Sequence, residues 1–268
     1  MIRRAVPVHP RAALVLLVVS GLGLAGFGWP LLVSVGAGNQ LAAHGADAPL
    51  LVSLLLPLLL AVVMAEVADG GIDAKAIAML GVLVACGAGL RTLGGGLTGF
   101  NAVFFLLLPA GRVLGRGFGF VLGALTLFTS AFLTAQGFGP WLPFQMLAAG
   151  WVGFGAGCLP DRITGRLESA CLAGYALAAG LTYGALLDLW FWPYVRAIPS
   201  LSYRPGAALP DQLVHFGRFY LTTSLGFDLP RGVGMAAFIL LAGKPVLAAL
   251  RRAARRASFG AVPLFEPT

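Results

Sequence analysis

Charged side chains are scarce in this sequence. Only 10% of its 268 residues are Asp, Glu, Lys or Arg, whereas 59% are apolar. A soluble globular protein carries about 25% charged residues, and so little charge would leave much of this apolar surface in contact with water. The scarcity therefore argues against an ordinary soluble domain and predicts that lipid surrounds most of the chain.

Cysteine and histidine are rare as well. The three cysteines are Cys86, Cys158 and Cys171, and the three histidines are His9, His44 and His215. The cysteines have no paired spacing, so neither a disulfide framework nor a metal cage is predicted. Because the histidines are scattered over termini and loops, a metal enzyme within the membrane is not expected, and we predict no cofactor.

Long apolar runs are abundant, and they predict an all-α integral membrane protein with about eight spans. A helix of about 20 apolar residues crosses the hydrocarbon layer. The runs cover about residues 12–35, 49–65, 75–90, 100–108, 117–134, 141–159, 167–189 and 228–242. The fourth run is expected to stop at Pro109 and the eighth to begin at Asp228, with a break or kink at Gly243-Lys244-Pro245. Between the last two runs, residues 195–227 form the only long polar stretch.

The spans contain no charged residue near their middle, since Glu66, Glu168, Asp188 and Arg231 lie at their ends. A charge at mid-bilayer costs at least about 2.5–3.5 kcal/mol, and carriers driven by ion gradients keep such charges for their relays. Their absence argues against a proton-coupled carrier. A Gly-x-x-x-x-Gly-Lys-Ser/Thr phosphate loop is also missing, so the chain is not expected to use ATP by itself.

The net charge of +8 is distributed as in a membrane protein. The positive-inside rule keeps most basic residues in the cytoplasm, which predicts a multi-pass cell-membrane protein with both termini cytoplasmic. The residues expected inside are Arg3, Arg4, Arg11, Lys75, Arg112, Arg116, Arg162, Arg166, Lys244, Arg251, Arg252, Arg255 and Arg256, and those expected outside are Arg91, Arg196, Arg204, Arg218 and Arg231. No folded basic surface interleaved with aromatic residues is visible, so nucleic acid is not an expected partner.

Small residues recur at helical spacing on several runs. Ala74, Ala78, Gly81 and Ala85 share one helix face, and such faces let helices approach closely. We expect the glycine series on the fifth and sixth runs, Gly115, Gly119, Gly123, Gly153 and Gly157, to pack within the chain. The alanine face fits internal packing and a partner helix equally well.

Polar and aromatic residues gather at the span ends predicted to lie outside. The candidate binding residues are Arg91, Asn101, Gln136, Trp141, Gln145, Asp188 and Arg231. Apolar walls with a few convergent polar groups are typical of a small-molecule site, although interfacial anchoring alone would explain the aromatic residues. Gln145 is the most informative member, because an amide about one turn inside a span needs a partner. The glycine-rich segment 91–99 is a candidate lid over the site.

Two runs of sequence resemble a known family. They are Gly115-Arg-Gly-Phe-Gly-Phe-Val-Leu-Gly-Ala-Leu-Thr-Leu and Gly139-Pro-Trp-Leu-Pro-Phe-Gln-Met-Leu-Ala-Ala-Gly-Trp-Val-Gly. Both look like the membrane-embedded substrate-binding S component of energy-coupling factor transporters, and the alanine face is similar to the family's first core helix. The resemblance covers about residues 73–257. It implies a six-helix substrate-binding core there, two extra helices in residues 1–72 that depart from the family, and a cytoplasmic tail in 258–268.

The resemblance also implies a function. The protein would capture a vitamin-like micronutrient at the outer face and deliver it together with a transmembrane coupling subunit and two cytoplasmic ATPases. In this arrangement Ala74, Ala78, Gly81 and Ala85 would face the coupling subunit, and the chain would not be an enzyme. Two alternatives remain open: a polytopic membrane enzyme, for which no reactive constellation is visible, and a non-transporting membrane scaffold.

Overall fold

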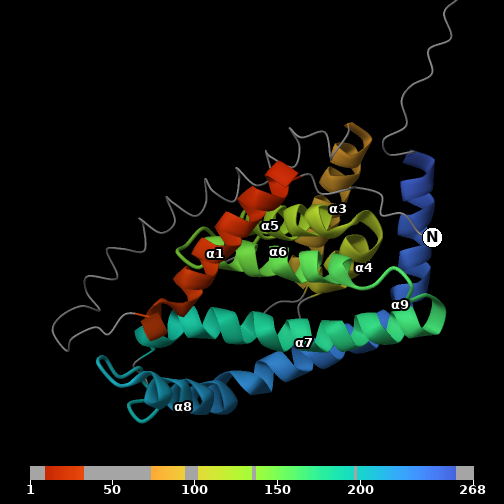
Figure 1. Cartoon of the computed structure of the whole chain (residues 1–268). Helices are drawn as coiled ribbons and strands as arrows, with labels where there is room; N and C mark the ends of the chain where they lie inside the picture. Colours follow the sequence, from red (N-terminus) through yellow and green to blue (C-terminus); the bar gives the residue numbers. More distant parts are fainter. Residues whose placement is uncertain (1–9, 33–73, 94–101, 135–136, 196–197, 258–268) are drawn as a thin grey trace, which may run out of the picture.

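The computed structural model describes residues 10–32, 74–93, 102–134, 137–195 and 198–257, and their regular structure is entirely helical (Figure 1). The α-helices are α1 (Pro10–Leu32), α3 (Ala74–Leu93), α4 (Val103–Leu114), α5 (Arg116–Ala131), α6 (Leu142–Cys158), α7 (Gly165–Phe191), α8 (Leu209–Phe219) and α9 (Leu225–Ala257). A 3-10 turn, Trp192–Tyr194, ends α7, and a π-helical turn, Tyr220–Ser224, joins α8 to α9. The predicted all-α class is confirmed for these residues.

Among the residues that the structure describes, four helical stretches are long and apolar enough to cross a membrane: Ala13–Leu31, Lys75–Thr92, Gly165–Tyr194 and Leu209–Arg256. The protein thus has the helix lengths and hydropathy of a membrane protein. Helices α4 and α5 are shorter apolar helices of 12 and 16 residues. The predicted second span, 49–65, lies outside the described residues, and so does most of the segment 1–72.

Two predicted boundaries are wrong. The fourth run was expected to stop at Pro109, but α4 continues to Leu114. Residues from Leu107 to Leu114 are all buried, so packing outweighs the one backbone hydrogen bond that a proline removes. The last helix was expected to begin at Asp228, yet the helical path already starts at Leu209.

The upstream part of this path, α8, lies within the stretch that was expected to be polar loop. Its buried residues are Gln212, His215 and Phe219, at steps of three and four, which place one face of a helix against the protein. That face packs on the end of α7, where the Trp192 ring lies 6.3 Å from Phe219 and 5.5 Å from Phe216. The aromatic contacts explain why this polar segment is helical.

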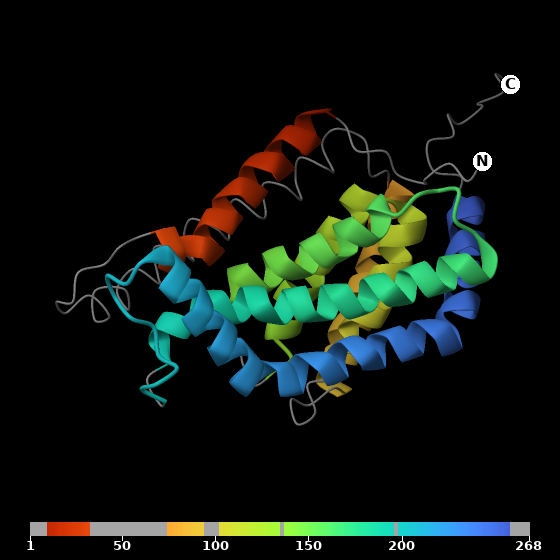
Figure 2. The same cartoon turned by 60° about the horizontal axis from the view of Figure 1, so that its bottom comes forward.

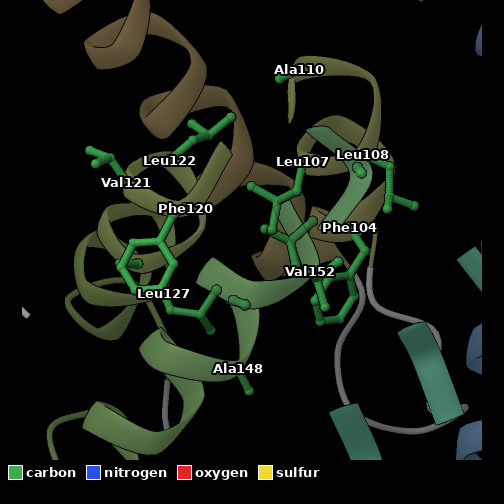
Figure 3. Packing of buried hydrophobic residues seen from close by; sticks show 14 of the residues in the cluster. Phe104, Leu107, Leu108, Ala110, Phe120, Val121, Leu122, Leu127, Ala148 and Val152 are labelled. Atoms are coloured by element: carbon green, nitrogen blue, oxygen red, sulfur yellow. The ribbon is translucent and has the colours of Figure 1, made fainter. Parts of the chain in front are cut away.

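Glycines bring α5 and α6 into backbone contact, as their spacing predicted. A Cβ atom at Gly153 would lie 2.1 Å from the backbone oxygen of Gly119, and one at Gly123 would lie 2.3 Å from that of Ala149. Gly115, at φ 115°, links α4 to α5 through a single residue, a conformation that other residues rarely adopt. Figure 3 shows apolar side chains of the core cluster around this contact, among them Phe104 and Leu107 of α4, Phe120 of α5 and Val152 of α6.

Helices α7 and α9 lie side by side in both views, with α4, α5 and α6 on one side of them (Figures 1 and 2). Helix α9 changes direction along its length (Figure 1), and the predicted breaking sequence Gly243-Lys244-Pro245 lies inside the helix, which continues to Ala257. We call residues 246–257 the α9 arm. The bundle has two polar ends. At the Arg91 end α3, α5 and α7 finish and α6 begins; at the Arg112 end α4 and α6 finish and α7 begins.

Candidate functional site

Arg91 is held at the meeting point of three helices. From the last turn of α3, its guanidinium donates to the Ser130 hydroxyl on α5 at 2.7 Å and to Gln145 Oε1 on α6 at 2.9 Å. The Ser130 hydroxyl in turn donates to the carbonyl of Leu127 at 2.9 Å. The side-chain oxygen of the half-buried Gln145 therefore has a hydrogen-bond partner, and two predicted site residues are in direct contact.

A second polar group lies between α7 and α9. Arg231 donates to Asp228 Oδ1 at 2.6 Å, and its guanidinium carbon lies 5.6 Å from the centre of the Tyr183 ring. Asp228 is only 3% exposed, and Tyr183 only 5%. The carboxylate reaches so far into α7 that a Cβ at Gly184 would overlap it. Glycine at 184 is thus what allows a charged pair to sit between two packed helices.

Tyr183 connects the two groups. Its hydroxyl lies near Arg91 as well as near Arg231 and Asp228, and because of this proximity we treat the α3–α5–α6 contact and the α7–α9 pair as one polar cluster. We define the polar cluster as Arg91, Gln145, Tyr183, Asp188, Asp228 and Arg231. Five helices supply or support its members, and apolar side chains such as Phe104, whose ring centre lies 4.8 Å from that of Tyr183, surround it.

Asp188 completes the cluster on the last turn of α7. It interacts electrostatically with Asp228 and Arg231, and the hydroxyl of Ser224 in the π-helical turn lies close to it. The Oδ2 atoms of Asp188 and Asp228 are buried and have no hydrogen-bond partner among the described residues. A buried acceptor that makes no hydrogen bond destabilises the folded protein. The π-helical turn is a second feature of this region, because such turns are frequent at functional sites.

Aromatic rings form the wall beside the cluster. Phe144 of α6 packs against Trp190 of α7 with ring centres 4.7 Å apart, and Phe27 of α1 lies 5.0 Å from Phe144. Farther out, the Tyr203 phenol donates to the carbonyl of Pro30 at 3.0 Å, and burial raises its pKa above the usual value. The phenol therefore stays a neutral donor that ties α1 to the segment between α7 and α8.

The predicted site residues have different outcomes. The structure brings Arg91, Gln145, Asp188 and Arg231 into the polar cluster. Trp141 is half-buried just before α6, and its ring lies over Gly139. Asn101 and Gln136 lie outside the described residues, as does most of the proposed lid. Arg91 itself belongs to helix α3, which continues to Leu93, so the lid does not begin at residue 91.

An ion network at the opposite end was not predicted from the sequence. Arg112, 6% exposed, donates through Nε to Glu168 Oε1 at 2.9 Å, and its other nitrogens reach the carbonyls of Leu159, Pro160 and Ile163 at 2.9–3.1 Å. Arg251 of the α9 arm also donates to Glu168, at 2.5 Å. The positions of both arginines in the sequence predict ordinary flanking charges. The three residues instead fix α4, α7, α9 and the α6–α7 loop together.

The alanine face of α3 is open on the described structure. Ala78, Gly81 and Ala85 are exposed, and nothing described lies within 4 Å of a Cβ added at Gly81. The opposite side of the helix packs inward through Leu80, Leu83 and Val84. The side chain of Ala74 lies outside the described residues. Internal packing among the described residues therefore does not explain why this face is built of small side chains.

The polar cluster offers two guanidinium groups, an amide, a phenol and carboxylate oxygens inside apolar and aromatic walls. No group of three or more His, Cys, Asp or Glu side chains in the described part of the chain could hold a metal ion. No protein-family model, curated protein or solved structure matches the chain.

Proposed function

We propose that the protein is the membrane-embedded substrate-binding subunit of an ATP-driven importer, of the S-component type that its sequence resembles. It would bind a vitamin or related micronutrient in the polar cluster, with the Arg91 end facing outward. A transmembrane coupling subunit and two separate cytoplasmic ATPases would drive delivery. The orientation follows from the positive-inside rule.

The observation that carries the proposal is the contact between Arg91 and Gln145. The sequence pattern predicts both residues as ligand contacts, and they meet across 2.9 Å although 54 positions separate them. Both side chains are half-buried, and the cost of withdrawing an arginine and an amide from water at the junction of three helices is offset by the hydrogen bonds that they make to each other or to a ligand. A binding subunit needs such a preformed polar group within apolar walls.

The exposed face of α3 supports the partner in this proposal. A stripe of small side chains lets a second helix approach closely, and Ala78, Gly81 and Ala85 are exposed together. The chain has no phosphate loop, so energy for uptake would have to reach it through another protein. Docking of the coupling subunit on α3 is the simplest route.

A bulky residue on this face tests the assignment. Gly81→Leu is expected to abolish co-purification with the coupling subunit and uptake into cells, while the isolated protein keeps its affinity for ligand. Gly174→Leu is the matched control, because Gly174 is also an exposed helical glycine with nothing described within 4 Å of an added Cβ. Loss of ligand binding in Gly81→Leu alone would assign the face to internal packing and defeat the coupling proposal.

A further inference from the structure

The Arg112 end carries a cluster of exposed arginines from three segments of the chain. Arg116 begins α5, Arg162 and Arg166 flank the start of α7, and Arg252 and Arg256 lie on the α9 arm. All five are exposed. We call them the basic surface.

Contacts beneath the basic surface fix its parts relative to one another. The Cα atom of Arg116 lies 2.6 Å from the position of a Cβ at Gly157, so the start of α5 sits directly on the last turn of α6. Arg112 binds the loop that leads to Arg162, and Arg251 binds Glu168 one turn after Gly165. The buried ion network therefore holds the three arginine-bearing segments together at one end of the bundle.

Within the described residues, negative charge does not neutralise this surface. Asp161 and Glu168 are the acidic residues at this end among the described parts of the chain, and both already bind Arg112, while Glu168 also binds Arg251. Thr164, which precedes α7, makes no side-chain capping hydrogen bond. The first amides of α7 and the positive end of its dipole thus add to the attraction for an anion.

The basic surface adjoins side chains that suit lipid tails. Leu167, which directly follows Arg166 on α7, is 61% exposed, and Leu241, which precedes Lys244 by one helical turn on α9, is 84% exposed. The α9 arm itself packs Leu247 and Leu250 inward and presents Arg252 and Arg256 outward. Exposed apolar side chains followed directly by exposed basic side chains are typical of a helix that lies at the boundary between acyl chains and headgroups.

We propose that the basic surface is a binding site for the phosphate headgroups of anionic phospholipids. This goes beyond the use of charge to orient the chain, because it assigns specific lipid binding to five named arginines and to the start of α7. It does not depend on the transport function. Each basic residue close to an anionic headgroup layer raises the binding constant by roughly fivefold. Removing three arginines should therefore lower the affinity for the lipid by about a hundredfold.

The test is a thermal-stability titration of the purified full-length protein in a neutral detergent. Dioctanoyl phosphatidylglycerol is the anionic probe, dioctanoyl phosphatidylcholine the neutral one, and inorganic phosphate the free anion. The variant is Arg162→Gln/Arg252→Gln/Arg256→Gln, and the matched control is Arg204→Gln/Arg218→Gln, which removes two exposed arginines from the segment that precedes α9. The lipid concentration at half-maximal stabilisation is the measured quantity.

We expect phosphatidylglycerol to raise the melting temperature of the parent and of the control alike, and the triple variant to need about a hundredfold more lipid. If the triple variant does not fold, Arg256→Gln alone should need roughly fivefold more, and Arg256→Lys should bind like the parent. Equal stabilisation by the two lipids would overturn the proposal. So would full stabilisation by inorganic phosphate, or stabilisation by a polyglutamate peptide but not by phosphatidylglycerol, which would indicate an acidic protein partner instead.

Discussion

Arg91 on α3 donates a hydrogen bond to the side-chain oxygen of Gln145 on α6, 2.9 Å away and 54 positions along the chain. Ser130 on α5 accepts a second hydrogen bond from the same guanidinium. One arginine thus joins the ends of three helices, and Tyr183 lies near both this arginine and the Asp228–Arg231 pair on α9. The interactions gather polar residues from distant parts of the sequence at the Arg91 end.

Removal of the Gln145 amide tests the role of this contact in binding. Gln145→Ala is expected to weaken ligand binding by up to about tenfold, which corresponds to about 1.4 kcal/mol, because one buried hydrogen bond between neutral groups is worth about 0.5–1.5 kcal/mol. Arg231→Ala should weaken it further if the ligand is an anion. Calorimetric titration of folded, monodisperse variants measures both. Parent-like affinity in both variants would show that the ligand binds elsewhere.

The ion network at the Arg112 end predicts a large difference between two acidic residues. Glu168→Ala leaves two guanidinium groups without their shared carboxylate, and breaking a buried ion pair in this way costs about 3–5 kcal/mol. Asp161 also binds Arg112, but at 3.4 Å and with its side chain 44% exposed, so Asp161→Ala should cost less than about 1 kcal/mol. Unfolding in mixed micelles compares the two variants. Similar losses would contradict a central role for Glu168.

Much of the helical pattern was predictable because it depends on apolar runs. Helices α1, α3, α5, α6 and α7 begin and end within a few residues of the predicted spans. The glycine contact between α5 and α6 also followed from spacing, since a four-residue step places Gly119 and Gly123 on one face. Helix α8 was not predicted because its sequence is amphipathic and contains no long apolar run.

Long-range pairing was the part that the sequence did not reveal. Arg112 and Glu168 lie 56 positions apart, and each resembles an ordinary flanking charge when it is read within its own segment. The burial that makes them a pair arises only after α4, α7 and α9 pack together. Gln145 was different, because an amide inside an apolar run requires a partner wherever the helices go.

The proposed orientation predicts which positions are accessible from outside the cell. In a background without Cys86, Cys158 and Cys171, a cysteine at exposed Ser200 should react with an impermeant maleimide in intact cells. One at exposed Ala253, on the α9 arm, should react only after permeabilisation. The asymmetry of basic residues underlies this expectation. Labelling of Ala253→Cys but not Ser200→Cys in intact cells would reverse the topology.

The central claim is that the polar cluster binds a small nutrient, and mass spectrometry of ligand retained by the purified protein tests it most directly. The parent protein, extracted mildly from membranes of cells grown in rich medium, is expected to release one vitamin-sized compound on denaturation, at close to one molecule per chain. The Arg91→Ala/Gln145→Ala variant, folded and monodisperse, should release little of it, while the Gly81→Leu variant should release the parent amount. A parent protein that retains only lipid, or a double variant that retains the same compound in full, would contradict the account.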